Sequence, residues 1–147
     1  MRKLLLILLV LFPIHGAWAA FTTPTDATCK HGKKEYLKAQ LYMPVDNREM
    51  AKKALKWLDK AIEKGCGDAA FHAGLIWQTM GDQEKWVAYT KKAAELEHPD
   101  GLIMYGAMLG GEGKTKEGCA MMKKGIKLGG ASPLGSNDAL LRMSGCK

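Results

Sequence analysis

The sequence lacks most of the short motifs that mark a catalytic or metal site. It has no C-x-x-C or H-x-x-x-H spacing, which argues against a zinc or other metal centre, and no G-x-S-x-G nucleophile elbow. The scattered aspartates and glutamates are explained as helix caps and solvated faces. His72 is interpreted as a residue of a groove or of the edge of the core, and His98 as a loop residue. We therefore expect no catalytic residue, no metal and no cofactor.

Two further absences limit the fold. No stretch alternates between apolar and polar residues over the length of a strand, which argues against a β-sheet. Beyond the N-terminal region, no apolar run reaches the ~20 residues that a helix needs to cross a bilayer. The sequence therefore predicts an all-α protein that does not insert into a membrane.

One glycine-rich stretch invites comparison with a phosphate-binding loop, because residues 110–115 end in Gly-Lys-Thr. The Walker pattern also needs a glycine five residues before Gly113, and this chain has Met108 there. No strand is predicted before the stretch either. We interpret it as a turn between helices, in which glycine permits a positive φ.

The N-terminus predicts export. Arg2 and Lys3 precede an apolar run over residues 4–12, which is too short for a membrane span and typical of a signal-peptide core. Residues 17–19, Ala-Trp-Ala, have the small-residue pattern that signal peptidase cleaves. We predict a signal peptide over residues 1–19 and cleavage before Ala20. The mature protein is then periplasmic or secreted.

The composition of the mature chain favours a small, disulfide-bonded protein. Its four cysteines all follow the predicted cleavage site, and an even number of cysteines in an oxidising compartment predicts disulfides. The formal net charge is +7, and loss of Arg2 and Lys3 leaves +5. This modest basic excess favours an acidic protein partner. We do not expect a nucleic-acid partner, because the mature protein is predicted to be exported. We expect the mature protein to be a monomer.

The chain resembles itself at an offset of thirty-two residues. Lys-Ala-Ile-Glu at 60–63 aligns with Lys-Ala-Ala-Glu at 92–95, and a further offset brings residues 123–126 to the same place. The second half of the unit is marked by three residues and their counterparts: Asp68, Phe71 and Gly74, then Asp100, Ile103 and Gly106. A period of this length is typical of a repeat architecture.

Each unit has the pattern of two helices. Apolar residues recur at helical spacing, glycines follow the helix ends, and polar residues stand at the starts. Asp46 with Glu49 forms a capping-box pattern, and Asp68 is expected to cap the next helix. Pro44 stops the first helix. The predicted helices cover residues 33–43, 46–65, 68–81, 82–97, 100–110, 115–128 and 136–145.

These features resemble the Sel-1-like repeat family, a relative of the tetratricopeptide repeats. The resemblance covers about residues 47–131. It is based on small residues at helix crossings and on an aromatic residue followed three positions later by Lys-Ala, as in Trp57 with Lys60-Ala61 and Tyr89 with Lys92-Ala93. The glycine-rich residues 106–113, which lead into Lys116-Glu117, also fit the family. The resemblance implies a short right-handed α/α solenoid of about three helix-hairpin repeats that binds other proteins and has no catalytic site. An N-terminal segment and extra helix (20–46) would precede a repeat domain (47–147) with units at about 47–81, 82–113 and 114–146.

The repeat interpretation selects among the three possible cysteine pairings. Cys119 lies near the start of one predicted helix and Cys146 just past the end of the next antiparallel helix, so both fall at one end of a hairpin. Cys29 and Cys66 stand in the same relation around the N-terminal helices. We predict these two bridges. The arrangement resembles a cysteine-rich branch of the family, although the middle unit here has no cysteine.

Two features are candidates for a partner-binding surface. Lysines at one repeat position, Lys60, Lys92 and Lys124, would line up as a positive stripe if the units stack. Trp86 stands where the other units have Ala54 and Gly118, and tryptophan is enriched at interface hot spots. The alternatives are a solvated lysine face and a tryptophan that fills a gap in the core. The aromatic residues at recurrent positions are interpreted as core: Trp57, Trp77, Tyr89 and Tyr105.

The function expected from the resemblance is that of an exported protein–protein interaction module without catalytic activity. One alternative is an immunity protein that neutralises a bacterial toxin delivered into the periplasm. A second is a cell-wall or β-lactam hydrolase of the cysteine-rich Sel-1-like kind. The partner would be a protein.

Overall fold

The computed structural model describes residues 27–43, 45–132 and 135–146. Within those ranges the protein has seven α-helices and no strand, which confirms the all-α prediction. The predicted signal peptide and its cleavage before Ala20 lie outside the described residues. None of the described helices is long and apolar enough to cross a membrane.

The helices follow the predicted order. They are α1 (Lys33–Gln40), α2 (Arg48–Glu63), α3 (Gly67–Thr79), α4 (Gln83–Glu95), α5 (Pro99–Gly111), α6 (Thr115–Lys127) and α7 (Asn137–Met143). The first helix is shorter than predicted, because the amides of Leu41 and Tyr42 bond to carbonyls three residues back and close it with a tight turn. The second is capped by Asn47 rather than Asp46, since the Asn47 side chain accepts the amide of Met50 at 2.9 Å.

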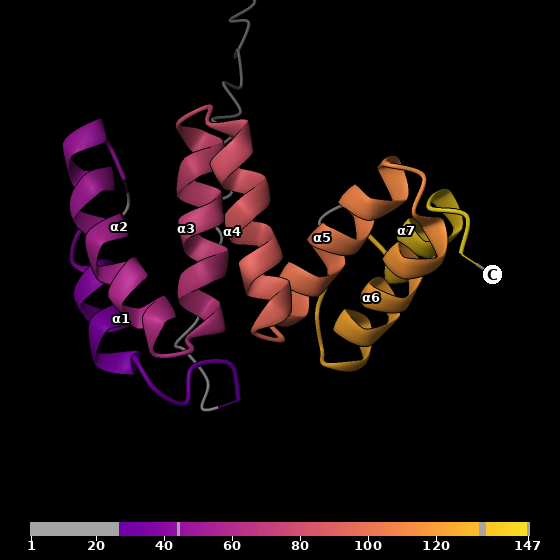
Figure 1. Cartoon of the computed structure of the whole chain (residues 1–147), viewed down its shortest axis with the longest axis horizontal. Coiled ribbons are helices and arrows are strands. Elements are labelled where there is room, and N and C mark those ends of the chain that lie inside the picture. The colour runs from indigo at the N-terminus through magenta and orange to yellow at the C-terminus, as the bar shows by residue number, and fades with distance from the viewer. Residues whose placement is uncertain (1–26, 44, 133–134, 147) are drawn as a thin grey trace, which may run out of the picture.

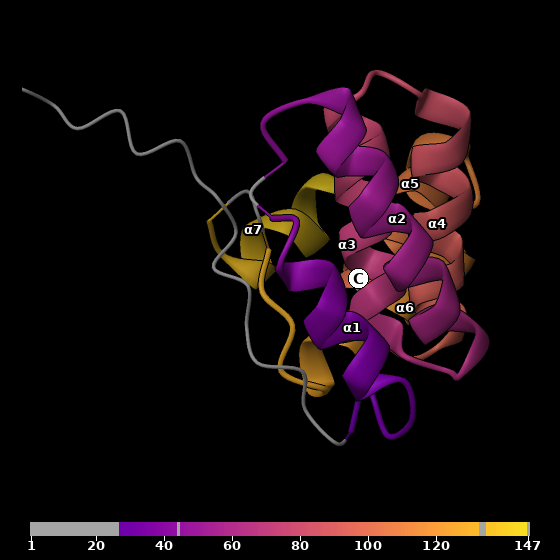
Figure 2. The same cartoon turned by 90° about the vertical axis from the view of Figure 1, so that its left-hand side faces the viewer.

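The helices lie in chain order from α1 and α2 at one end to α6 and α7 at the other (Figure 1). Backbone contacts are concentrated between consecutive helices and are most extensive between α5 and α6, while α7 has few with α6. In the view turned by 90°, α1 and α7 lie to one side of α2 and α4 (Figure 2). Each helix therefore buries its apolar face mainly against its neighbours in sequence.

The core consists of two apolar clusters. The larger joins α1, α2 and α3 through residues such as Tyr36, Leu58 and Ala73, and the smaller joins α5, α6 and α7 through Ile103, Met122 and Leu140. Three aromatic residues predicted as core are only partly buried and pack against the larger cluster: Trp57, Trp77 and Tyr89. Most of the apolar burial on which stability depends thus lies inside the two clusters.

Glycine sets the close approach of α5 and α6. A Cβ atom at Gly106 would lie 2.7 Å from the carbonyl oxygen of Gly118, and one at Gly125 would lie 2.5 Å from the carbonyl oxygen of Pro99. Real side chains do not tolerate contacts this short against backbone. The small residues predicted at helix crossings therefore allow these two backbones to pack directly against each other.

Candidate functional site

A disulfide closes each end of the helix stack. Cys29, before α1, is bonded to Cys66 between α2 and α3, and Cys119 of α6 is bonded to Cys146 just after α7. These are the pairs that the helix order predicts, and no cysteine is free. Both bridges fit a protein that folds in an oxidising compartment.

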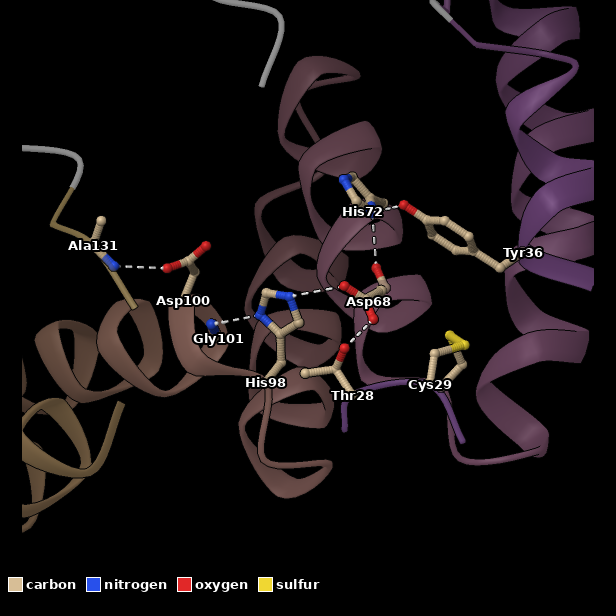
Figure 3. A network of polar contacts seen from close by, with 10 residues as sticks. Thr28, Cys29, Tyr36, Asp68, His72, His98, Asp100, Gly101 and Ala131 are labelled. Atoms are coloured by element: carbon tan, nitrogen blue, oxygen red, sulfur yellow. Dashed lines mark hydrogen bonds and ion pairs between the residues drawn. A yellow bond between two sulfur atoms is a disulfide. The ribbon is translucent and has the colours of Figure 1, made fainter. Parts of the chain in front are cut away.

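A buried polar network lies beside the first bridge and is centred on Asp68 (Figure 3). The sequence predicted Asp68 as a helix cap, but α3 begins at Gly67, so Asp68 lies within the first turn. Its carboxylate accepts a short hydrogen bond from the Thr28 hydroxyl and lies 3.5 Å from Nε2 of His98. Asp68 is 4% exposed and His98 7% exposed. The network therefore joins the N-terminal segment, α3 and the start of α5 out of contact with bulk water.

The contacts of His98 define its protonation. Its Nδ1 accepts the backbone N–H of Gly101 at 3.2 Å, so the proton of the neutral ring is on Nε2 and faces Asp68. His98 lies in the loop between α4 and α5, as predicted, and is the N-cap of α5. The sequence signal for this cap was Pro99, because proline is favoured at the first position of a helix.

His72 is buried in the core, and its interpretation as a groove or core-edge residue is wrong. Its Nδ1 lies 2.9 Å from both the backbone carbonyl oxygen of Asp68 and the Tyr36 hydroxyl oxygen. A carbonyl oxygen can only accept, so Nδ1 carries the proton and donates it between the two oxygens. Burial lowers the pKa of His72 to about 4 and raises the pKa of Tyr36.

Neighbouring side chains stabilise the ionised form of the Asp68 carboxyl group. Burial by itself raises the pKa of this carboxyl group, but hydrogen bonds from His98 and Thr28 outweigh it, and the pKa is lowered. Asp68 also converges with Cys29 and Cys66, the one group of possible metal ligands in the described part of the chain. Both sulfur atoms are committed to the disulfide, so the thiolates that a metal requires are not present. The network holds chain segments together.

The lysines of the predicted positive stripe already contact the protein itself. All three are exposed: Lys60, Lys92 and Lys124. The Lys60 ammonium lies 4.6 Å from the centroid of the Trp57 ring. The Lys92 ammonium lies 3.7 Å from a Glu95 oxygen, and that of Lys124 bonds to Glu97. Because two of the three lie beside a carboxylate, the field of a continuous stripe is reduced.

Trp86 lies half-buried in α4. Its indole Nε1 is buried and has no hydrogen-bond partner among the described residues. An anchor that reaches out to a partner would hold its ring in solvent. The position favours the alternative in which Trp86 fills space between helices.

The sequence missed a different aromatic residue. Trp57, interpreted as core, is only half-buried, and two ammonium groups lie over its ring: Lys38 of α1 at 4.4 Å and Lys60 of α2 at 4.6 Å from the centroid. No sequence signal connects Lys38 with Trp57, because the two residues meet only when α1 packs on α2.

Comparisons of the chain with protein-family models, with curated proteins and with solved structures find no match in any of the three. The resemblance to the Sel-1-like family therefore stays a prediction. The function has to be argued from the chain itself.

Proposed function

We propose that this chain is a short α/α solenoid of about three Sel-1-like repeats that is exported and binds another protein, without catalytic activity of its own. The observation that carries the proposal is the stack of consecutive helices, each packed on its neighbours in sequence (Figure 1). Such a stack offers a continuous outer surface that suits an extended or helical partner.

Contacts between successive units support the repeat interpretation. Asp68 and Asp100 are thirty-two residues apart, and each reaches forward to the segment between the two helices of the next unit. Asp68 lies beside His98, and the Asp100 carboxylate accepts the backbone N–H of Ala131 at 3.0 Å (Figure 3). Two equivalent carboxylates thus bridge successive units in a similar way, as nearest-neighbour stacking requires.

The buried ionisable groups support a binding role over a catalytic one. Tyr36, Asp68, His72 and His98 are the buried side chains of the described residues that can ionise, and each takes part in a contact that joins chain segments. A general acid or base needs access to a substrate. These four groups are enclosed, and their polar atoms bond to other parts of the protein.

The proposal is tested by capture followed by titration. The full-length gene is expressed in its host with a C-terminal tag, and the processed protein is recovered from the periplasmic fraction. We expect a co-purifying protein that binds the purified mature chain in a saturable complex. Changing Lys60, Lys92 and Lys124 together to Glu should slow association, and the effect should shrink as salt rises, because surface charges steer encounter.

Circular dichroism of the triple variant is the control for folding. Recovery of the protein only from the cytoplasm with residues 1–19 attached would contradict export. Turnover of a peptidoglycan fragment or a β-lactam by the purified protein, with no partner present, would replace the binding module with an enzyme.

A further inference from the structure

The positive charge of this protein is concentrated in its first helix pair. Residues 27–64, which contain α1 and α2, have ten lysines and arginines and five aspartates and glutamates, a net charge of +5. Residues 65–146 have nine of each and no net charge. The net positive charge of the protein is therefore located at one end of the helix stack.

The exposed side of α2 carries this charge at a cost to the helix. Lys52, Lys56 and Lys60 are all exposed and follow one another at intervals of four residues. Like charges at this spacing destabilise a helix by a few tenths of a kcal/mol per pair. Among the described residues, neither Lys52 nor Lys56 has a carboxylate within ion-pair distance. Helix stability does not explain this pattern, whereas an acidic ligand would.

Trp57 lies on the same helix, beside Lys60. Lys38 and Lys60 come from different helices and place their ammonium groups 4.4 and 4.6 Å from one ring centroid. The ring attracts each cation, while the two cations repel each other. A carboxylate that approached both would remove the repulsion, and the exposed part of the tryptophan would supply apolar contact area.

We propose that this basic face, formed by Lys38, Lys52, Lys56, Trp57 and Lys60, binds an acidic segment of a protein partner. The inference rests on the proposed function and names the chemistry of its partner. The carboxylates of the segment lie along the α2 lysines and near Lys38, and its apolar side chains contact the exposed part of Trp57.

A protein segment fits this face better than a lipid surface. Exposed apolar side chains do lie on or beside α1, since Leu37 is 44% and Leu41 is 76% exposed. However, α1 is eight residues long, and lysines at 34 and 38 interrupt its outer side. Helices that lie in a membrane interface need a broad, continuous apolar face. The two leucines are suited to the apolar side chains of an acidic peptide.

The experiment uses the mature chain with both disulfides and a fluorescein-labelled peptide of ten glutamates as the probe, followed by fluorescence anisotropy. Lys38→Gln with Lys60→Gln should weaken binding of the peptide by about fivefold or more, and added salt should reduce that difference. The matched control is Lys91→Gln with Lys127→Gln, which removes the same charge from exposed positions of α4 and α6. It should weaken binding by less than about twofold, because distant surface charges are screened.

Equal weakening by both pairs would show binding to overall charge alone and overturn the proposal. A second arm uses phosphatidylglycerol vesicles, and tighter binding to vesicles than to the peptide would assign the face to lipid instead. Binding of the protein captured in the tagging experiment distinguishes this proposal from the proposed function as a binding module. A partner that binds the Lys38→Gln, Lys60→Gln variant as wild type would refute the basic face and leave the binding module intact.

Discussion

At the scale of single residues, the protein uses its buried polar groups as connectors. His98 accepts the Gly101 amide with one ring nitrogen and faces Asp68 with the other, so one side chain both caps α5 and joins it to α3. His72 similarly connects α3 to Tyr36 of α1. Because burial favours the neutral form of His72, acid should weaken the connection that this ring makes.

Acidification should therefore destabilise the protein through His72. Its pKa of about 4 in the folded protein lies below the 6.5 of an unperturbed histidine, so the unfolded chain binds more protons between these values. The free energy of unfolding should fall as the pH decreases from 6.5 to 4.5, by about 2 kcal/mol from this group. His72→Gln should remove most of this pH dependence of the free energy of unfolding. Urea denaturation at several pH values would measure it.

The comparison needs a second histidine as its control. His31→Gln, at an exposed position, should leave the pH dependence unchanged. Measurements stop at pH 4.5 because carboxyl groups contribute at lower pH; stability from the lowered pKa of Asp68 is lost only below its ordinary value of 3.8. An unchanged slope in His72→Gln would mean that another group causes the acid sensitivity.

At the scale of elements, helix packing depends on a few glycines where backbones meet. Gly106 of α5 faces Gly118 of α6, whereas Gly110 of α5 has nothing within 4 Å of the place of a Cβ atom. Two glycines in one helix thus have opposite roles. The first is required by contact with a neighbouring backbone, and the second only costs backbone entropy when the helix forms.

Alanine substitutions should separate these roles. Gly106→Ala should lower the free energy of unfolding by about 1 to 3 kcal/mol, because its Cβ would be forced against the Gly118 carbonyl. Gly110→Ala should raise it by about 0.5 to 1 kcal/mol, because alanine loses less backbone entropy in a helix. Urea midpoints of the two variants give the comparison. A neutral Gly106→Ala would show that α5 and α6 can move apart without penalty.

At the scale of the whole molecule, the two disulfides differ in how many other contacts join the segments that they connect. The first bridge lies beside the larger core cluster and the buried network, where many other contacts join the same segments. The second closes the end at which α7 has few backbone contacts with α6. Loss of the second bridge should therefore free α7 while the rest of the stack stays folded.

The double variant Cys119→Ala, Cys146→Ala tests this division. It should lose about 3 kcal/mol of stability, as expected for a bridge that closes 27 residues of chain, and remain predominantly helical by circular dichroism. Hydrogen exchange should become fast in α7 and stay slow in α2 and α3. Complete unfolding under mild conditions would show that the bridge, rather than packing, holds the C-terminal unit.

The local features of this protein could be predicted from its amino-acid sequence. Helical periodicity, glycines after helix ends and polar caps predicted all the observed helices within a few residues, because these signals act through neighbours along the chain. The cysteine pairs also followed from helix order, since antiparallel neighbours bring their ends together.

Which side chains meet between different helices depends on the tertiary structure. It moved Asp68 from a cap to the centre of a buried network, placed His72 in the core, and brought Lys38 over Trp57. Such contacts depend on how different helices rotate against each other. That rotation is determined by the packing of all their side chains together, and no local pattern in the sequence encodes it.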